Sequence, residues 1–459
     1  MDDSTTPRPR ARYSPRAFLA AIAHRLRWRQ LWQPVDDKVV IHQKTVKHTP
    51  LQKLRDAFIC ILTGARGMVE VEKRLRNDPV LQQAFGRECC AEQSSIQDTL
   101  DACTVENVLQ LKQASTAIYR KHSQGFRHDY KTHWQILDAD MTGMPCGPKA
   151  EFATKGYFAG QPNRRGRQLA RCLATRYHEI VCEELYDGKH QLQAALIPLL
   201  EQANQVLELN TEQRARTIIR LDSGGGTVED INWVLTQGFA YHGKDYSGRR
   251  AEHLCQSVTE WLDDPKCPGR QVGWVTDPHP YLRPVVRIAA RCRKANGQWG
   301  VGLLVSTLSA ADVIALTNQP CHYVKDAHAV LLAYIYFYDA RGGGIETANK
   351  EDKQGLGLTA RNKKRFAAQQ MLVLLAALAH NVIVWTTRWL VGYTPKLVGY
   401  GILRMVRDVF TTTGFIQMGA DGRPEHVVLN VHDRLAAGLV DALRDIFQSE
   451  HIALNLGET

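Results

Sequence analysis

The first part of the chain has the apolar spacing of helices. Leu51, Leu54, Phe58 and Leu62 recur at intervals of three or four residues, so they share one helical face. Similar spacing, interrupted by polar turns, continues to about residue 125. Short helices joined by polar turns are compatible with helix-turn-helix DNA binding. They are equally compatible with a plain helical bundle, and the pattern alone does not choose between the two.

From about residue 130, short apolar runs alternate with segments of helical spacing. Strands are expected at 133–140, 177–186, 217–222 and 238–241, and helices at 192–209 and 228–235. Strands that alternate with helices indicate an α/β unit.

The pattern becomes rich in turns and alternating runs between residues 245 and 328. Pro and Gly cluster there, and 285–289 and 299–303 alternate as antiparallel strands do. One more long strand is expected at 329–338, followed by the Gly342–Gly344 run and a helix from Ile345. Near the C-terminus, Asp421-Gly422 predicts a hairpin within 413–430.

Residues 371–390 approach the roughly 20 apolar residues that a membrane-spanning helix needs. His380, Asn381 and two threonines interrupt the run. A buried core helix is therefore favoured over a membrane span, and no membrane partner is expected.

Charge and cysteine content narrow the class of protein. The 459 residues include 58 Lys and Arg against 47 Asp and Glu, a net charge of +11. This excess favours an anionic partner, most commonly nucleic acid, although a merely basic enzyme has the same balance. The 11 cysteines form no C-x-x-C pair, which indicates a reducing compartment without a zinc ribbon. No apolar run follows the basic N-terminus, so a secretory signal is not expected.

Three acidic residues are candidates for metal chemistry. Asp140 and Asp222 each end a short apolar run, and catalytic groups in α/β sheets usually lie at strand ends. Glu346 begins the helix after the glycine run and shares a helical face with Asn349 and Lys353. Carboxylates are ligands for Mg²⁺, and two such ions can clamp a reacting phosphodiester. Turn formation by the two aspartates is the ordinary alternative.

These residues lie in three strings: LDADMTGMP (137–145), RLDSGGGT (220–227) and YDARGGGIETANKEDKQGLG (338–357). Together they resemble the DDE transposases of bacterial insertion sequences. The similar branch has a β-rich insertion before the catalytic Glu and a Tyr-x2-Arg-x3-Glu-x6-Lys signature. Tyr338, Arg341, Glu346 and Lys353 fill its positions, with four residues instead of three between Arg and Glu.

The resemblance implies an α/β fold. It consists of an RNase H-like catalytic core interrupted by a β-rich insertion, after an α-helical N-terminal DNA-binding region. The expected parts are the N-terminal region 1–128, the first part of the core 129–244, the insertion 245–328, the second part of the core 329–400 and a C-terminal region 401–459.

By the same resemblance, Asp140, Asp222 and Glu346 are the catalytic metal ligands. The metal is Mg²⁺, with Mn²⁺ as a substitute. Asp138 competes with Asp140, because residues two apart on a strand share a face; Asp140 is preferred as the nearer to the strand end.

DNA contacts are expected from several other side chains. The expected residues are Tyr338, Arg341 and Lys353 on phosphates, Lys155, Arg167 and Arg171 along a backbone, and Trp274 stacked on a flipped base. Ion pairing, solvation or packing in a β-core are the alternatives for these side chains.

The activity implied is cut-and-paste DNA transposition: hydrolysis of a phosphodiester at the element's ends, then strand transfer by the freed 3′-hydroxyl. The partners would be double-stranded DNA at terminal inverted repeats, target DNA and a second copy of the chain in a synaptic homodimer. The place would be the bacterial cytoplasm, at the nucleoid when bound to DNA. The alternatives are an inactive, transposase-derived DNA-binding protein and an RNase H-like nuclease without strand transfer.

Overall fold

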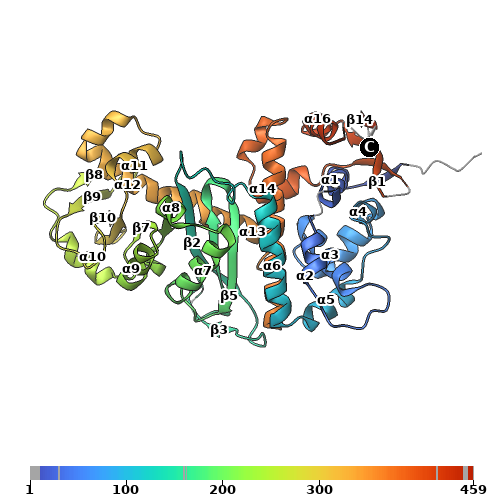
Figure 1. The fold of residues 1–459 in the computed structure, drawn as a ribbon, viewed down its shortest axis with the longest axis horizontal. Helices are drawn as coiled ribbons and strands as arrows, with labels where there is room; N and C mark the ends of the chain where they lie inside the picture. The colour runs from blue at the N-terminus through green and yellow to red at the C-terminus, as the bar shows by residue number, and fades with distance from the viewer. Residues whose placement is uncertain are drawn as a thin grey trace, which may run out of the picture. The chain divides into compact units, whose positions relative to one another are not determined.

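The computed structural model describes residues 11–28, 31–158, 161, 163–419, 422–447 and 453–457. These divide into two compact units (Figure 1). One comprises Met1–His122, Lys149–Glu151 and Lys350–Thr459, and the other comprises Ser123–Pro148 and Phe152–Asn349. The boundary therefore falls inside the expected second part of the core, between residues 349 and 350.

The first unit is mainly helical. Its N-terminal elements are β1 (Arg12–Ser14), α1 (Ala17–Trp28), α2 (Gln33–Lys38), α3 (Pro50–Leu62), α4 (Pro79–Ala84), α5 (Gln93–Ala102) and α6 (Val105–His122). Its C-terminal elements are α14 (Phe366–Leu390), α15 (Ile402–Arg404), β12 (Gly414–Met418), β13 (Pro424–Asn430), α16 (Ala436–Phe447) and β14 (Ala453–Gly457). Strand β1 joins the C-terminal strands in a sheet of order β1-β12-β13-β14. The hairpin expected within 413–430 is confirmed by the antiparallel pair β12/β13, although Asp421 lies outside the described residues.

Helix α14 contains the apolar run that resembles a membrane span. Among the described residues it is the one helix long and apolar enough to cross a membrane, and 89% of its most apolar stretch is buried inside the protein. Helices α3, α5 and α6 pack against it. This burial is what the core-helix interpretation predicts.

The second unit is built on one sheet of mixed direction. Its strands are β2 (Gln135–Pro145), β3 (Thr154–Lys155), β4 (Arg165–Ala174), β5 (Glu179–Asp187), β6 (Thr217–Leu221), β7 (Ala240–Lys244), β8 (Leu262–Asp263), β9 (Arg270–Val275), β10 (Val286–Arg293) and β11 (Trp299–Ser306). The strand order is β3-β4-β2-β6-β7-β11-β10-β9-β8, with β5 on the outer side of β4. Strands β2, β6 and β7 are parallel, whereas β4 and β5 run antiparallel to their neighbours.

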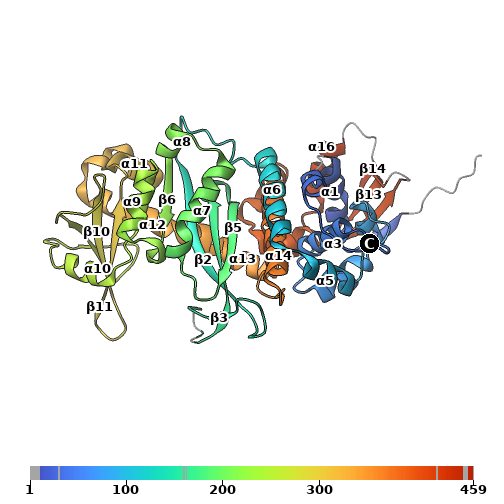
Figure 2. The ribbon, with the colours of Figure 1, turned by 60° about the horizontal axis from the view of Figure 1, so that its bottom comes forward.

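The residues expected to form a β-rich insertion continue this sheet. Strand β11 pairs with β7, so β8 to β11 extend the core sheet at one edge (Figure 2). The same stretch also contains α10 (Gly248–Cys255) and α11 (Ala310–Leu316).

Helices cover both faces of the sheet. On one face, α7 (Leu192–Leu207) packs on β4 and β5, and the Cys182 thiol on β5 donates to the carbonyl of Leu199. On the other face, α12 (Ala327–Arg341) packs on an apolar cluster that includes Ile218, Ile288 and Leu304. Helices α8 (Thr211–Ala215) and α9 (Val228–Thr236) complete the connections between the parallel strands.

The strand expected at 329–338 is wrong, because these residues form α12. The run is apolar on nearly every side, and a short continuous apolar run does not distinguish a buried helix from a buried strand. Asp326 starts the helix by accepting hydrogen bonds from the backbone N–H groups of His328 and Ala329.

The glycine run does not separate α12 from the next helix. A π-helical turn, η6 (Gly342–Glu346), leads directly into α13 (Thr347–Gly355), with a kink at Gly344. The C-terminal half of α13 belongs to the first unit.

Candidate active site

The strand register brings Asp140 and Asp222 to the same level of the sheet. The parallel pairing of β2 with β6 ends with Asp138 opposite Arg220. Asp140 and Asp222 each come two residues later, so they lie on the same face as this last pair, one step beyond it. Asp222 follows the end of β6, whereas Asp140 lies within β2, which continues to Pro145. The expectation that both residues end a strand is therefore wrong for Asp140.

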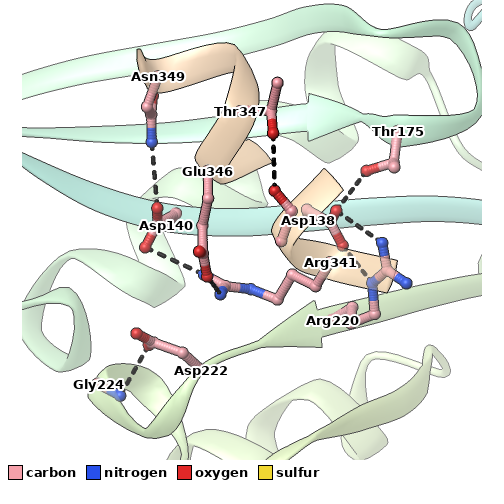
Figure 3. A network of polar contacts seen from close by, with 11 residues as sticks. Asp138, Asp140, Thr175, Arg220, Asp222, Gly224, Arg341, Glu346, Thr347 and Asn349 are labelled. Atoms are coloured by element: carbon pink, nitrogen blue, oxygen red, sulfur yellow. Dashed lines mark hydrogen bonds and ion pairs between the residues drawn. The ribbon is translucent and has the colours of Figure 1, made fainter. Parts of the chain in front are cut away.

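The turn between α12 and α13 adds Glu346 and Arg341 to this face (Figure 3). Arg341 Nη1 donates a hydrogen bond to Glu346 Oε1 over 2.7 Å, and Arg341 Nη2 lies 3.0 Å from Asp140 Oδ1. The Arg341 side chain is 2% exposed, whereas Glu346 is 58% exposed. Asp222 accepts a hydrogen bond from the backbone N–H of Gly224 over 2.8 Å. The structure thus pairs Asp140 and Glu346 with one buried guanidinium, and Asp222 is near enough to affect the pKa of Asp140 and of Arg341.

Burial and the two neighbouring carboxylates change the pKa of Asp140. The pKa of Asp140 is raised to about 6, mainly by burial and further by Asp222 and Glu346, against the opposing effect of Arg341. Burial alone would lower the pKa of Arg341, but Asp140 and Asp222 raise it overall. The group therefore has an excess of negative charge that a single arginine offsets only in part.

The donor set has the chemistry of a magnesium site, since three carboxylates offer hard oxygen ligands. In the described part of the chain, however, no three His, Cys, Asp or Glu side chains lie close enough to hold one ion. Arg341 pairs with two of the three carboxylates instead. The residues fit Mg²⁺ in kind, as hard oxygen ligands, although the three carboxylates would have to lie closer together to share one ion.

Asp138 forms an ion pair with Arg220 and not with Arg341. It is fully buried and accepts hydrogen bonds from Arg220 Nε over 2.6 Å and from Arg220 Nη2 over 2.8 Å. The Thr175 hydroxyl donates to the same carboxylate over 2.6 Å. Arg220 in turn donates to the carbonyl of Phe337 on α12. These bonds make Asp138 part of the framework beneath the site, which favours Asp140 as the metal ligand.

Two residues that the sequence alone did not assign contact members of the site: Lys244 contacts Tyr338, and Asn349 contacts Asp140. Lys244 ends β7, the third parallel strand, and its Nζ lies 4.8 Å from the ring centre of Tyr338. Burial raises the pKa of Tyr338 to about 12, and Asp222 and Glu346 add to this effect.

Asn349 donates from Nδ2 to Asp140 Oδ2 over 3.1 Å. Asn349 lies three residues after Glu346 and so shares its helical face, and this spacing is the feature of the sequence that could have identified it.

Two of the arginines expected to follow a DNA backbone are buried. Arg167 is 1% exposed and Arg171 is 0% exposed. Arg171 is paired with Glu183 and Asn349. The expectation of DNA contact is wrong for both, and the ion-pair alternative holds for Arg171.

The remaining candidates differ in their exposure. Lys155 is exposed on β3, opposite Arg165 on β4. Trp274 is half-buried, with its ring centre 6.0 Å from that of Tyr334 in the α12 cluster, so it packs as a core residue. Lys353 is half-buried in the part of α13 that belongs to the other unit.

Gly344 allows the close approach of η6 to β2. Its backbone is non-helical (φ −90°, ψ −105°), and a Cβ there would lie 2.8 Å from both Asp138 Oδ2 and Thr175 Cγ2. We expect Gly344→Ala to cost about 1–3 kcal/mol in the free energy of unfolding, because neither neighbour is free to move away. Urea unfolding measures this cost. In Gly343→Ala the new methyl would meet no atom within 4 Å. Equal effects of the two substitutions would contradict this interpretation.

The raised pKa of Asp140 predicts a pH-dependent cost in stability. Because the folded protein holds this proton more tightly than the unfolded chain does, ionising Asp140 costs stability as the pH rises from about 4 to about 6. Relative to wild type, Asp140→Asn is expected to gain stability over this interval and to keep the gain above it. The gain is at most roughly 3 kcal/mol, at about 1.4 kcal/mol per pKa unit. Urea unfolding in EDTA between pH 4 and 8 measures it, and a difference that does not change with pH would contradict the shift.

Comparison with known proteins finds matches among solved structures but none among family models or curated sequences. No protein-family model and no curated protein sequence matches it. Among solved structures, seven chains match. One is the cryo-EM structure of a piggyBac transposase synaptic complex with hairpin DNA, with 10% identity over 96% of this chain and 83% of that chain and a TM-score of 0.45. With a TM-score below 0.5, this likeness carries no inference about function.

Proposed function

We propose that this protein is a DNA transposase of the DDE type, with Asp140, Asp222 and Glu346 as its metal-binding carboxylates. The observation that carries the proposal is the register of β2 and β6, which puts Asp140 and Asp222 at the same level on one face of the sheet. Glu346, the last residue of η6, lies on the same face. Carboxylates from three distant parts of the chain are thereby held together despite their repulsion. A structural role does not require that cost, whereas binding of divalent cations does.

Each side chain has a task in this proposal. Bound Mg²⁺ would supply the activated nucleophile and offset the charge that develops on the phosphodiester. Arg341 would offset part of the charge of Asp140 and Glu346 until ions bind. Because its guanidinium is 2% exposed, it would have to turn outward before it could donate to a DNA phosphate. Lys244 and Tyr338, stacked at the rim, offer a positive charge and a hydroxyl to a neighbouring phosphate.

The sheet order supports an RNase H-like core as part of the same proposal. Three antiparallel strands, β2, β4 and β5, are followed by parallel β6 and β7 on the other side of β2. The net charge of +11 supports double-stranded DNA as partner. We also propose terminal inverted repeats and target DNA as the sequences bound, a homodimer in the synaptic complex, and the bacterial cytoplasm as the place of action.

An excision assay tests the proposed function. A donor plasmid carries the gene's own flanking ends around a marker, and the cells express wild type or Glu346→Ala at equal levels. Excision by wild type alone is the expected result. Magnesium-dependent cleavage of the same ends by Glu346→Ala at the wild-type rate would refute the assignment. Cleavage by wild type without strand transfer would instead identify a nuclease.

One observation favours an alternative without catalysis. Arg341 bridges Asp140 and Glu346 in the way that a permanent ion pair would. A transposase-derived DNA-binding protein would retain this arrangement. It would bind the ends but neither bind Mn²⁺ nor cleave.

The end of the sheet formed by β3 and β4 is proposed as a contact for the DNA backbone. Lys155 and Arg165 are cross-strand partners of like charge, which is unfavourable without an anion nearby. Among the described residues neither forms an ion pair. We expect Lys155→Ala/Arg165→Ala to weaken DNA binding similarly for all sequences and to reduce the slope of log K against log[salt] by about 2. Fluorescence anisotropy at 50–300 mM salt measures it. An unchanged slope would contradict the contact.

A further inference from the structure

One row of polar side chains crosses three strands beneath the candidate site. Asp140 on β2 is directly opposite Arg171 on β4, and Arg171 is directly opposite Glu183 on β5. Arg171 Nε donates to Glu183 Oε2 over 3.0 Å, and both side chains are almost completely buried. Arg171 therefore pairs with the acid on its outer side, and its direct strand neighbour Asp140 is left to another partner.

That partner is Asn349, which reaches the row from α13. Arg171 Nη1 donates to Asn349 Oδ1 over 3.1 Å. Figure 3 shows the next bond, in which Asn349 Nδ2 donates to Asp140 Oδ2 over 3.1 Å. An arginine side chain has only donors, so it turns the amide oxygen of Asn349 toward itself. The amide N–H groups must then point toward Asp140. The two hydrogen bonds from Arg171 through Asn349 to Asp140 therefore have one direction, and Arg171 sets it.

We infer that Asn349 is a positioning residue for the metal-binding carboxylates. It bonds one oxygen of Asp140 and leaves the other to Arg341 and the ion. Because it lies one helical turn after Glu346, the same bond also holds α13 against β2. Asn349 is 5% exposed, so it does not itself offer a surface to DNA. The inference rests on the proposed function, since it assigns Asn349 a role at that site.

Manganese binding without DNA tests the inference directly. Free Mn²⁺ is measured by its EPR signal during titration of the full-length protein: wild type, Asn349→Leu, Asn349→Ser and Asp222→Asn. Partners that orient metal ligands typically contribute about 10- to 100-fold in metal affinity. We expect losses of this size for Asn349→Leu and Asn349→Ser. In a cleavage assay, kcat should fall while the KM for DNA stays unchanged. Thr347→Ala is the matched control, because Thr347 is exposed on the same helix and donates only to the carbonyl of Gly342.

The outcomes separate the two proposals. If wild type binds Mn²⁺ and Asp222→Asn does not, but Asn349→Leu binds like wild type, the role of Asn349 is refuted and the metal site stands. If wild type does not bind Mn²⁺, the proposed function fails, and the inference fails with it. If Asn349→Leu does not fold, as judged by circular dichroism, the smaller and polar Asn349→Ser decides. Wild-type affinity in that variant refutes the role.

Discussion

Asp222→Asn is expected to abolish magnesium-dependent DNA cleavage without destabilising the protein. Loss of a metal-binding carboxylate removes several kcal/mol of transition-state stabilisation, which corresponds to roughly 10³-fold in rate. Asparagine retains the side-chain oxygen that accepts from the backbone N–H of Gly224, so the turn after β6 keeps its cap. Removing the charge also relieves the repulsion that raises the pKa of Asp140. Stability should therefore be unchanged or higher while activity is lost.

Single-turnover cleavage of the element's ends in 5–10 mM Mg²⁺, together with urea unfolding, measures both quantities. Glu229→Gln is the matched control, because Glu229 is an exposed acid on α9, which follows the same loop. Cleavage by Asp222→Asn within tenfold of wild type would contradict the metal-ligand assignment. Loss of cleavage together with loss of folding would assign Asp222 a structural role instead.

Arg220→Met is expected to destabilise the second unit by about 3–5 kcal/mol, because it leaves a buried carboxylate without its counter-charge. Asp138 and Arg220 are 0% and 2% exposed, with two hydrogen bonds between them. Arg220 also bonds the carbonyl of Phe337 and lies over its ring, so the substitution loosens α12 as well. Among the described residues, the Thr175 hydroxyl is then the donor that remains to Asp138, and it carries no charge.

Hydrogen exchange of peptides from β2 and β6 measures this destabilisation within the second unit. The double variant Arg220→Met/Asp138→Leu is the control, because it removes the stranded charge and should recover much of the stability. If the single variant lost less than about 1 kcal/mol, the pair would be far less important than its burial implies. Equal losses in the single and double variants would point to packing rather than charge.

Four strands and two helices between residues 130 and 244 could be read from the sequence, but β4, which pairs with β2 and β5, was not predicted. Strand lengths, helix starts and turns there depend on neighbouring residues, such as the apolar run before Asp222 and the glycines after it. The same local information failed at 329–338, where a run apolar on all sides forms α12. Only the apolar cluster over β6, β10 and β11 makes a helix the better way to bury it.

The candidate site divides in the same way. Asp140, Asp222 and Glu346 were identifiable because carboxylates next to apolar runs and glycine turns are a local pattern, and their grouping follows from the strand register. Asp140 was preferred over Asp138 because it was expected to lie nearer to the strand end, but β2 continues past both residues to Pro145. Arg220, from another strand, favours Asp140 on a different ground, by pairing with Asp138.

The sequence by itself therefore determined the basic charge, the three acids and several strands and helices between residues 130 and 244, since each depends on residue type and on spacing along one stretch of chain. Only the tertiary structure decided which charged side chains are partnered and buried. It buried Arg167 and Arg171 and left Lys155 exposed on β3. It also placed Lys244 against Tyr338 and Asn349 against Asp140. The physical reason is that burial and ion pairing join residues that are far apart in the chain, and no local pattern encodes that pairing.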